Sequence, residues 1–394
     1  MVNGAVWTDL EGDGYPELVL ACEWGPVKIW RNHGGRLQAW DAPLEWVGGG
    51  QGRPQKLSQK TGWWTGVTAG DLDGDGRMDL VVGNWGLNCK YQEFLVGGLR
   101  LYHGDVDDNG VWDLVEAYLN PEMKKVVPWR DWKTMRGAIP ILNERFKTYR
   151  EYGEASVAEI LGAGFKQMQE LRVDVLETVV LLNRGDHFEV RVLPLEAQLA
   201  PVFGVCVGDY DGDGNEDVFL SQNFFGTDLE TGRYDAGRGL WLRGDGRGGF
   251  RAVPGQESGV KVYGEQRGAA LSDYDGDGRV DLVVSQNAGE TKLYRNEGGK
   301  AGLRVRLVGA GSNGDGIGGV VRLGAGGKWG AAREVHGGSG YWSQDSAVAV
   351  MSLGEGVARE VQVRWPGGKT TTGQVPEGAK EVRVTADGNV EKMR

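Results

Sequence analysis

The sequence is poor in the residues that build disulfide frameworks and transition-metal sites. Its 394 residues include three cysteines, Cys22, Cys89 and Cys206, and four histidines that are scattered along the chain. Neither a zinc site nor a redox motif is therefore indicated. Cys22 and Cys206 lie within apolar runs, which favours small buried side chains over the alternative, a disulfide.

Long apolar runs and excess positive charge are also missing. No stretch approaches the roughly 18 apolar residues of a membrane-spanning helix, so we expect no membrane span. The net charge is −11, which argues against a general attraction to nucleic acid or to an anionic membrane. No serine or cysteine occurs in a motif that pairs a nucleophile with a base, so nothing local indicates covalent catalysis.

Glycine, in contrast, is abundant. The chain contains 68 glycines, more than twice the roughly 7% of average proteins. Glycine favours tight turns with positive φ and destabilises helices. Together with 15 tryptophans and the valine-rich runs between the turns, this composition predicts an all-β fold.

An internal repeat dominates the sequence. Five segments share an apolar strand, an acidic loop with glycine and a second apolar strand. Successive loops start 62, 34, 104 and 64 residues apart. Two of these gaps fit one four-stranded β-propeller blade each, while the short gap predicts a trimmed connection and the long gap an insertion. The loops begin at Asp9, Asp71, Asp105, Asp209 and Asp273.

Each loop carries oxygen-bearing side chains at positions 1, 3, 5 and 9, with glycine at position 6. Alternate residues of a tightly curled loop point inward, and such hard oxygen ligands suit calcium better than magnesium or zinc. We therefore predict up to five structural Ca²⁺ ions, with weaker binding at the first loop because its acids are longer. The predicted ligands are Asp9, Glu11, Asp13 and Glu17; Asp71, Asp73, Asp75 and Asp79; Asp105, Asp107, Asn109 and Asp113; Asp209, Asp211, Asp213 and Asp217; and Asp273, Asp275, Asp277 and Asp281.

Two other interpretations of the loops stay open. They can be acidic surface turns without metal, although four carboxylates in one loop would then repel one another strongly. The third loop also matches the EF-hand calcium pattern, because Glu116 stands at its position 12. Its flanking segments alternate like strands and not like helices, which favours the same unit as in the other loops.

These segments resemble the FG-GAP/VCBS repeat family, whose blades are similar to those of the integrin α-subunit propeller. The resemblance covers roughly residues 4–299 and includes third-strand motifs such as KIWRNHGG at 28–35 and KLYRNEGG at 292–299. After residue 302, the segments GSNGDGIGGVVRL, REVHGGSGYWSQDS and VQVRWPGGK resemble the ASPIC/UnbV domain. The resemblance implies a propeller over residues 1–300, a small β-domain over residues 301–394, a secreted or cell-surface location and no established catalytic chemistry.

The number of blades departs from the family pattern. About five blades are visible, whereas the resemblance implies a ring of seven. The chain also starts without a signal peptide, at a point that looks like the middle of a repeat. We therefore expect an N-terminally truncated chain, with further blades or a partner chain completing the ring.

Residues 120–172 interrupt the β pattern. They are expected to form a helical insertion, with capping boxes at Thr148/Glu151 and Ser156/Glu159. Such an insertion is expected to cover the end of the ring, and a partner site is the alternative.

Antiparallel connectivity assigns the two faces of the propeller. All acidic loops lie on one face, and the connection that follows each second strand lies on the opposite face. Aromatic residues beside Asn and Gln in these connections predict a sugar or peptide site, and packing between blades is the alternative. The predicted ligand-binding residues are Trp24, Trp85, Phe224 and Phe225.

Three functions are compatible with these features. The preferred one is an exported calcium-binding module for adhesion or scaffolding, with an extracellular glycan or protein as its ligand. The second is a polysaccharide lyase or hydrolase that uses the opposite face, where the sequence offers Glu23 and Glu290 as carboxylates. The third is a structural component whose open sheet edges pair with another chain.

Overall fold

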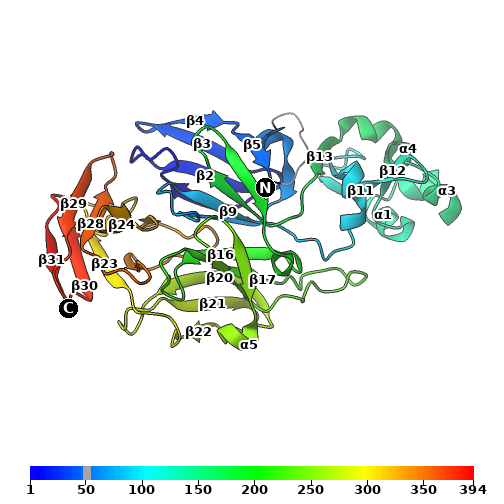
Figure 1. Cartoon of the computed structure of the whole chain (residues 1–394). Coiled ribbons are helices and arrows are strands. Elements are labelled where there is room, and N and C mark those ends of the chain that lie inside the picture. The colour runs from blue at the N-terminus through cyan, green and yellow to red at the C-terminus, as the bar shows by residue number, and fades with distance from the viewer. Residues whose placement is uncertain (48–54) are drawn as a thin grey trace.

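The computed structural model describes residues 1–47 and 55–394 and is mostly β. In Figure 1, several sheets occupy the middle of the molecule, the C-terminal strands lie at one end, and a part with several short helices lies at the other. No helix in the described ranges is both long and apolar enough to cross a membrane.

Four sheets, antiparallel except for one pair of strands, carry four of the five repeats, and we call them the sheet array. The first contains β1 (Val2–Thr8), β2 (Glu17–Pro26), β3 (Lys28–His33) and β4 (Arg36–Trp40), with β7 (Thr61–Trp63) paired to β2. The second has the order β6 (Gln55–Lys56), β5 (Pro43–Trp46), β15 (Phe188–Val192), β14 (Val179–Asn183), β9 (Asp79–Gly83) and β8 (Gly66–Gly70), with β5 parallel to β15. The third contains β16 (Val202–Gly208), β17 (Asp217–Gln222), β18 (Leu240–Gly244) and β19 (Phe250–Val253). The fourth contains β20 (Glu265–Ser272), β21 (Asp281–Asn287) and β22 (Lys292–Tyr294).

The first strands of these sheets, β1, β8, β16 and β20, pack side by side in this order. Glycine permits the close approach, because a Cβ atom on Gly66 would lie 2.0 Å from the carbonyl oxygen of Phe203 in the next sheet. At the equivalent place in the fourth sheet, a Cβ on Gly268 would lie 2.8 Å from the carbonyl oxygen of Trp342, which belongs to the C-terminal part. No closed ring of sheets is seen in the described residues, so the number of blades stays a prediction.

The insertion has other bounds than expected. β9 pairs with β14, so the chain leaves the second sheet after residue 83 and returns at residue 179. The excursion contains a separate sheet in the order β12 (Lys125–Pro128), β11 (Asp113–Asn120), β10 (Leu99–Gly104) and β13 (Gln169–Val173). The loop from Asp105 joins β10 to β11. This placement corrects the expectation that this loop belongs to a blade in line with the other four.

Short helices pack on this inserted sheet around their own apolar core, which includes Leu142, Val157, Ile160 and Leu161. Both expected capping boxes are confirmed at Thr148 and Ser156. The helices are α1 (Trp132–Ala138), α2 (Leu142–Arg145), α3 (Tyr149–Gly153) and α4 (Val157–Leu161), and α5 (Gly255–Ser258) lies in the array. Short 3₁₀ helices occupy Leu57–Gln59, Gln92–Gly97, Gly162–Gln167 and Leu195–Gln198.

The C-terminal part contains two sheets around a core that includes Val305, Val361, Val363 and Val382, all fully buried. One sheet has the order β27 (Val348–Met351), β23 (Leu303–Val308), β30 (Glu381–Thr385) and β31 (Val390–Lys392). The other has the order β25 (Lys328–Trp329), β24 (Val320–Ala325), β28 (Glu360–Arg364) and β29 (Thr370–Gln374), with β26 (Arg333–Glu334) paired to β24.

Residues 335–346, here the inserted segment, run from β26 to β27 and enter the sheet array. The backbone N–H of Ala5 in β1 donates to the carbonyl oxygen of Gly340 at 3.2 Å, and Ser346 N–H donates to the carbonyl oxygen of Leu271 in β20 at 2.8 Å. The segment therefore links the first and fourth sheets of the array.

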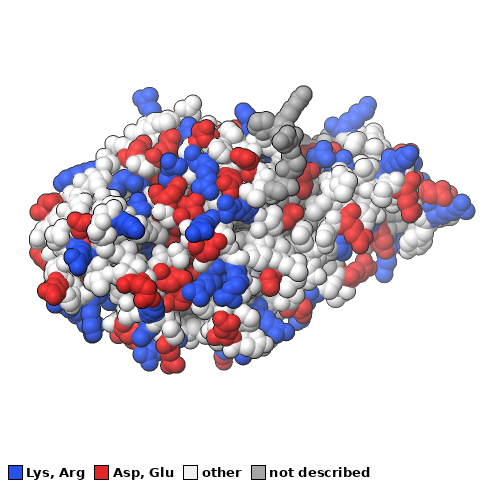
Figure 2. All heavy atoms as spheres, viewed as in Figure 1, with Lys and Arg blue, Asp and Glu red and all other residues white. Residues whose placement is uncertain are grey.

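The cysteines behave as expected, because all three are free and Cys22 and Cys206 are buried. Charged side chains of both signs are interspersed on the face shown in Figure 2, where neither sign forms one continuous patch.

Candidate metal centres and the cavity opposite them

Each acidic loop is closed by its own first carboxylate. Asp71 Oδ2 accepts the backbone N–H of Gly76 at 2.9 Å, and Asp105, Asp209 and Asp273 accept the equivalent N–H groups in their loops. The side chain at position 5 accepts the N–H at position 7, as Asp75 does from Arg77 at 2.8 Å. These bonds curl the loop and hold positions 1 and 3 near the start of the following strand.

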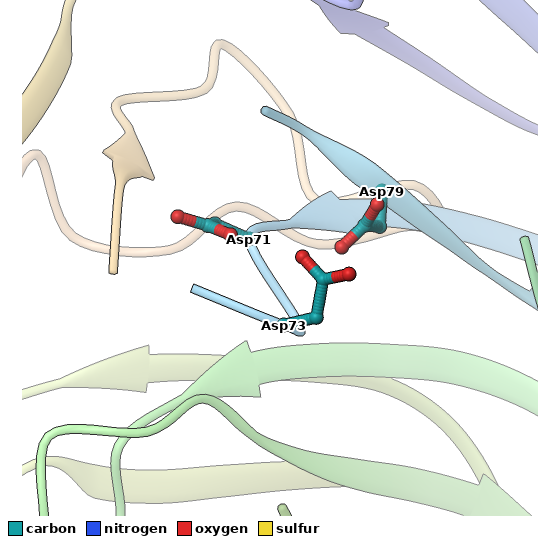
Figure 3. A group of neighbouring side chains, drawn as sticks. All are labelled: Asp71, Asp73 and Asp79. Carbon is teal, nitrogen blue, oxygen red and sulfur yellow. The ribbon is translucent and has the colours of Figure 1, made fainter. Parts of the chain in front are cut away.

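Four of the five loops bring carboxylates together at positions 1, 3 and 9. In each of these loops, one oxygen from each of the three acids lies within 4.8 Å of the others. Figure 3 shows Asp73 and Asp79 pointing toward one another, with Asp71 at the start of the loop beside them. The groups are Asp71, Asp73 and Asp79; Asp105, Asp107 and Asp113; Asp209, Asp211 and Asp217; and Asp273, Asp275 and Asp281.

The loop that starts at Asp9 differs from the other four in the placement of its acids. Although it is fully described, Asp9, Glu11 and Glu17 do not form such a group. Glu17 Oε2 accepts the N–H groups of Leu10 and Glu11 at 2.8 and 3.2 Å, and the side chain of Glu11 pairs with Arg31. Weaker metal binding at this loop stays a prediction.

The position-9 acid links the loop to the third strand of its sheet. Asp79 Oδ2 accepts from Leu72 N–H at 2.9 Å, while Oδ1 accepts from Asn183 N–H of β14 at 2.7 Å. The other array loops repeat this pair of bonds at Glu17, Asp217 and Asp281. Burial raises the pKa of Asp79 and of Asp217 to about 8 each, since an ionised carboxylate is poorly solvated there.

The donor set fits a hard divalent cation. Burial raises the pKa of Asp71 to about 7 and of Asp209 to about 6. Asp71 Oδ1, Asp73 Oδ1 and Asp107 Oδ1 are buried oxygen atoms without a hydrogen-bond partner. Unpaired buried oxygens beside neighbouring carboxylates are costly, and a cation removes both the repulsion and the unmet hydrogen-bonding capacity.

Arginines from two parts of the chain contact the acids of the array loops. From the third strand or its turn, Arg31, Arg184, Arg243 and Arg295 contact the position-3 acids Glu11, Asp73, Asp211 and Asp275. From the C-terminal part, Arg364 Nε lies 2.7 Å from Asp9 Oδ2, and Arg304 pairs with Asp273. Asp71 Oδ2 accepts the N–H of Ala332 at 2.7 Å. The C-terminal part therefore lies directly on three of the position-1 acids.

The EF-hand interpretation of the third loop is wrong. The flanking elements β10 and β11 are paired strands and not helices. Glu116 does not face the loop, because its Oε2 lies 3.4 Å from the guanidinium of Arg130.

A second feature, a cavity of about 340 Å³, opens where the first strands of the array begin and the second strands end. This is the side of the array opposite the acidic loops, since each loop joins the far ends of the same strands. Among its lining residues are Trp63, Trp85, Phe203, Phe224 and Tyr234. Polar lining comes from Glu23, Glu116, Arg130 and Asp228.

The structure divides the predicted ligand-binding aromatics. Trp85 and Phe224 line the cavity, with ring centroids 5.1 Å apart. Trp24 is not a lining residue and packs on Trp63 with ring centroids 5.4 Å apart. Phe225 is not a lining residue and lies under the guanidinium of Arg233. The same aromatic cluster therefore contains rings that line the cavity and rings that pack against them.

The sequence interpretation missed the lining residues that come from distant parts of the chain. Tyr91, Glu116 and Arg130 belong to the insertion, and Tyr341 belongs to the C-terminal part. No local pattern could have placed them at this cavity. Glu290, the second carboxylate expected on this face, pairs with Lys292 at the surface and does not line the cavity.

Comparisons with known proteins agree with the resemblance. Residues 9–82 match the model of the FG-GAP-like repeat, and residues 309–391 match the model of the ASPIC and UnbV domain, so the expected family is confirmed over these ranges. Neither matched family is an enzyme family.

Two curated relatives share part of the chain. Cartilage acidic protein 1 of Xenopus tropicalis is 29% identical over 184 residues, which cover 45% of this chain and 28% of that protein. The Homo sapiens protein of the same name is 28% identical over 206 residues, 50% of this chain and 30% of that protein. The chain thus matches less than a third of the length of either relative.

Among solved structures, the V. cholerae biofilm matrix protein Bap1 is aligned over 96% of this chain and 60% of its own, with 9% identity. The TM-score of 0.15 is too low to bear on the fold.

Proposed function

We propose that this chain is an exported calcium-binding module for adhesion or scaffolding, in which a β-propeller over residues 1–300 is joined to a β-domain over residues 301–394. The observation that carries the proposal is the recurrence of three carboxylates within 4.8 Å, with buried oxygens that have no hydrogen-bond partner. The FG-GAP-like repeat and the similarity to cartilage acidic protein 1 support an extracellular setting.

Calcium is proposed as a structural ion. Positions 1, 3 and 9 would supply carboxylate oxygens, and a carbonyl from the loop would add to the six to eight oxygens that Ca²⁺ takes. An ion that binds the folded loop and not the unfolded chain stabilises the fold by about 2.7 kcal/mol at a hundredfold excess over its Kd. Extracellular millimolar calcium would keep such sites filled.

Calorimetric titration of chelator-treated protein tests this proposal. We expect heat from several calcium ions per chain and little from magnesium, which demands a tighter octahedral shell. Replacing Asp71, Asp209 and Asp273 together by Ala should remove most of the signal. Unchanged binding in that triple variant, or no binding in the original chain, would contradict the proposal.

The ligand is proposed to be an extracellular glycan or protein that binds at the cavity opposite the acidic loops. A polysaccharide lyase or hydrolase is the second candidate, because Glu23, Glu116 and Asp228 bring three carboxylates to one cavity. Incubation with a panel of polysaccharides separates the two: release of reducing ends or of unsaturated products supports the enzyme, and retention without cleavage supports the binding module.

A further inference from the structure

The cavity opposite the acidic loops has aromatic walls that are held rigidly. Trp63 and Trp85 are stacked with centroids 4.1 Å apart, and the edge of Tyr234 meets Trp85 at 5.3 Å. Glu23 Oε1 accepts the indole N–H of Trp63 at 2.6 Å, which fixes the orientation of that ring. A volume of about 340 Å³ is at the lower end of the roughly 300–1,000 Å³ of small-ligand sites.

Two buried polar atoms of the lining residues lack hydrogen-bond partners. Trp85 is 6% exposed, and its indole N–H has no hydrogen-bond acceptor. Glu116 Oε2 accepts no hydrogen bond and has only the ionic contact with the guanidinium of Arg130 at 3.4 Å. An indole N–H without an acceptor and a carboxylate oxygen with only a long ionic contact favour a ligand that both accepts and donates hydrogen bonds.

The charges around the cavity disfavour an ionic ligand of either sign. An anion would meet the carboxylates of Glu23, Glu116 and Asp228. A cation would meet Arg130, which pairs with both Glu116 and Asp228 and so offsets part of their negative charge. Neutral hydroxyl groups can use the same mixture of carboxylates, guanidinium and indole N–H, while the apolar face of a sugar ring packs on aromatic rings.

The inserted segment completes this cavity from the C-terminal part. Its Tyr341 lines the cavity and packs on Phe203 with centroids 5.6 Å apart. The preceding Gly340 has φ of +80°, and a Cβ there would lie 1.8 Å from the carbonyl oxygen of Val67. Only glycine fits at this close approach, which sets the place of Tyr341.

The other side of the segment is anchored as well. Asp345 Oδ1 accepts the N–H of Leu271 at 2.7 Å, and Ser339 Oγ accepts the N–H of Asp345 at 2.8 Å. Trp342, next to Tyr341, is 89% exposed and has a left-handed φ of +50°. A large apolar side chain held in a strained, exposed conformation adds a contact surface at the same tip.

We propose that this cavity binds a neutral sugar unit of a glycan, and that Tyr341 from the C-terminal part is one of its binding residues. The inference rests on the proposed role as a ligand-binding module, but not on calcium occupancy. It assigns the C-terminal part a direct role in recognition, in addition to its contacts with the acidic loops.

A glycan array tests the inference on the full chain in millimolar calcium. The probes are immobilised neutral, sulfated and uronate-containing oligosaccharides, together with basic and acidic peptides. We expect retention by neutral oligosaccharides. For the best of them, Tyr341→Ala and Glu116→Gln should each lower the affinity about tenfold by calorimetry, because each removes a contact made inside a largely desolvated site.

Tyr263→Ala is the matched control, since Tyr263 is 62% exposed and is not a lining residue. The affinity of this variant for the oligosaccharide should stay unchanged. Each variant is also melted with and without calcium, so that loss of folding is not read as loss of binding. Retention by peptides or charged oligosaccharides alone overturns the inference, as does a Tyr341→Ala affinity equal to that of the control. No retention by any neutral probe, with calcium-dependent melting intact, also overturns it and leaves the calcium proposal standing.

Discussion

The loops of the sheet array and the loop of the insertion carry the same acidic motif in different surroundings. In the second array loop, Asp79 is fully buried and accepts N–H groups from both its own loop and β14. In the insertion, Asp113 is partly exposed and accepts only the N–H of Val106, at 3.0 Å. A loop with aspartates at positions 1, 3 and 9 thus brings three carboxylates together in both settings, whereas the burial of these carboxylates depends on the neighbouring strands.

The geometry of the third strand explains the difference. In the array, the third strand of each sheet reaches the start of the second strand, where the position-9 acid lies. In the insertion, β12 pairs only with Ala117–Asn120, at the other end of β11. Asp113 consequently receives no N–H from a third strand.

Calcium removal gives the largest expected effect. We predict that EDTA lowers the melting temperature of the array by about 10 °C or more, because several sites each lose ion binding that the unfolded chain does not make. Differential scanning calorimetry with added calcium, EDTA or magnesium measures it. Equal melting temperatures in calcium, EDTA and magnesium would contradict this prediction.

The pH dependence of the calcium-free protein is the next effect. In the fold, the pKa is about 8 for Asp79 and for Asp217 and about 7 for Asp71, whereas an unfolded Asp has a pKa of about 3.9. Between these pKa values the folded state binds more protons than the unfolded state. The stability that these three groups contribute is therefore fully present below about pH 4 and is lost as the pH rises toward 8.

Urea unfolding in EDTA between pH 5 and 8 should show this decline, at up to about 1.4 kcal/mol per pH unit for each group. Calcium should flatten the profile, because the ion holds the carboxylates ionised. A flat profile in EDTA would mean that the buried acids are ionised without metal.

Matched substitutions at position 9 compare the two settings directly. Asp79→Asn should cost about 3 kcal/mol, because an amide nitrogen would face one of two backbone N–H groups. Asp113→Asn should cost about 1 kcal/mol or less, since its second oxygen has no backbone donor. Chemical denaturation in calcium measures both, and equal losses would show that burial does not distinguish the loops.

The smallest predicted effect concerns the C-terminal part. Arg304→Ala removes the partner of Asp273, whose side chain is 1% exposed, and should cost about 1–2 kcal/mol in calcium, where the ion also neutralises Asp273. Lys300→Ala is the control, because Lys300 and its partner Glu355 are both exposed. We expect the Arg304 variant to lose more stability in EDTA than in calcium, and an equal loss for the Arg304 and Lys300 variants would contradict the prediction.

The sequence predicted the features that depend on local pattern. The loop positions, the strands on both sides of them and the capping boxes at Thr148 and Ser156 lie where they were expected. Alternation and turn chemistry act over a few residues and can be recognised there. The face opposite the loops was also predictable, because antiparallel connectivity fixes it.

Features that depend on distant pairing could not be predicted. β9 pairs with β14 although 95 residues separate Gly83 from Val179, and the intervening β10–β11 unit has the same local pattern as the array. The contact of Arg364 with Asp9 joins residues at opposite ends of the chain, and the contact of Arg304 with Asp273 joins the C-terminal part to the sheet array. The cavity likewise combines the array, the insertion and Tyr341, and no spacing in the sequence marks that combination.

The close fit of Gly340 against β8 has a consequence for biosynthesis. The strands of the array end at Tyr294, and the inserted segment is made only when translation reaches residues 335–346. At roughly 5–20 residues per second, about 3–10 s separate these two events. During this interval, Ala5 and Leu271 have no partner from the segment. The first and fourth sheets therefore make these backbone contacts only after the segment has been synthesised.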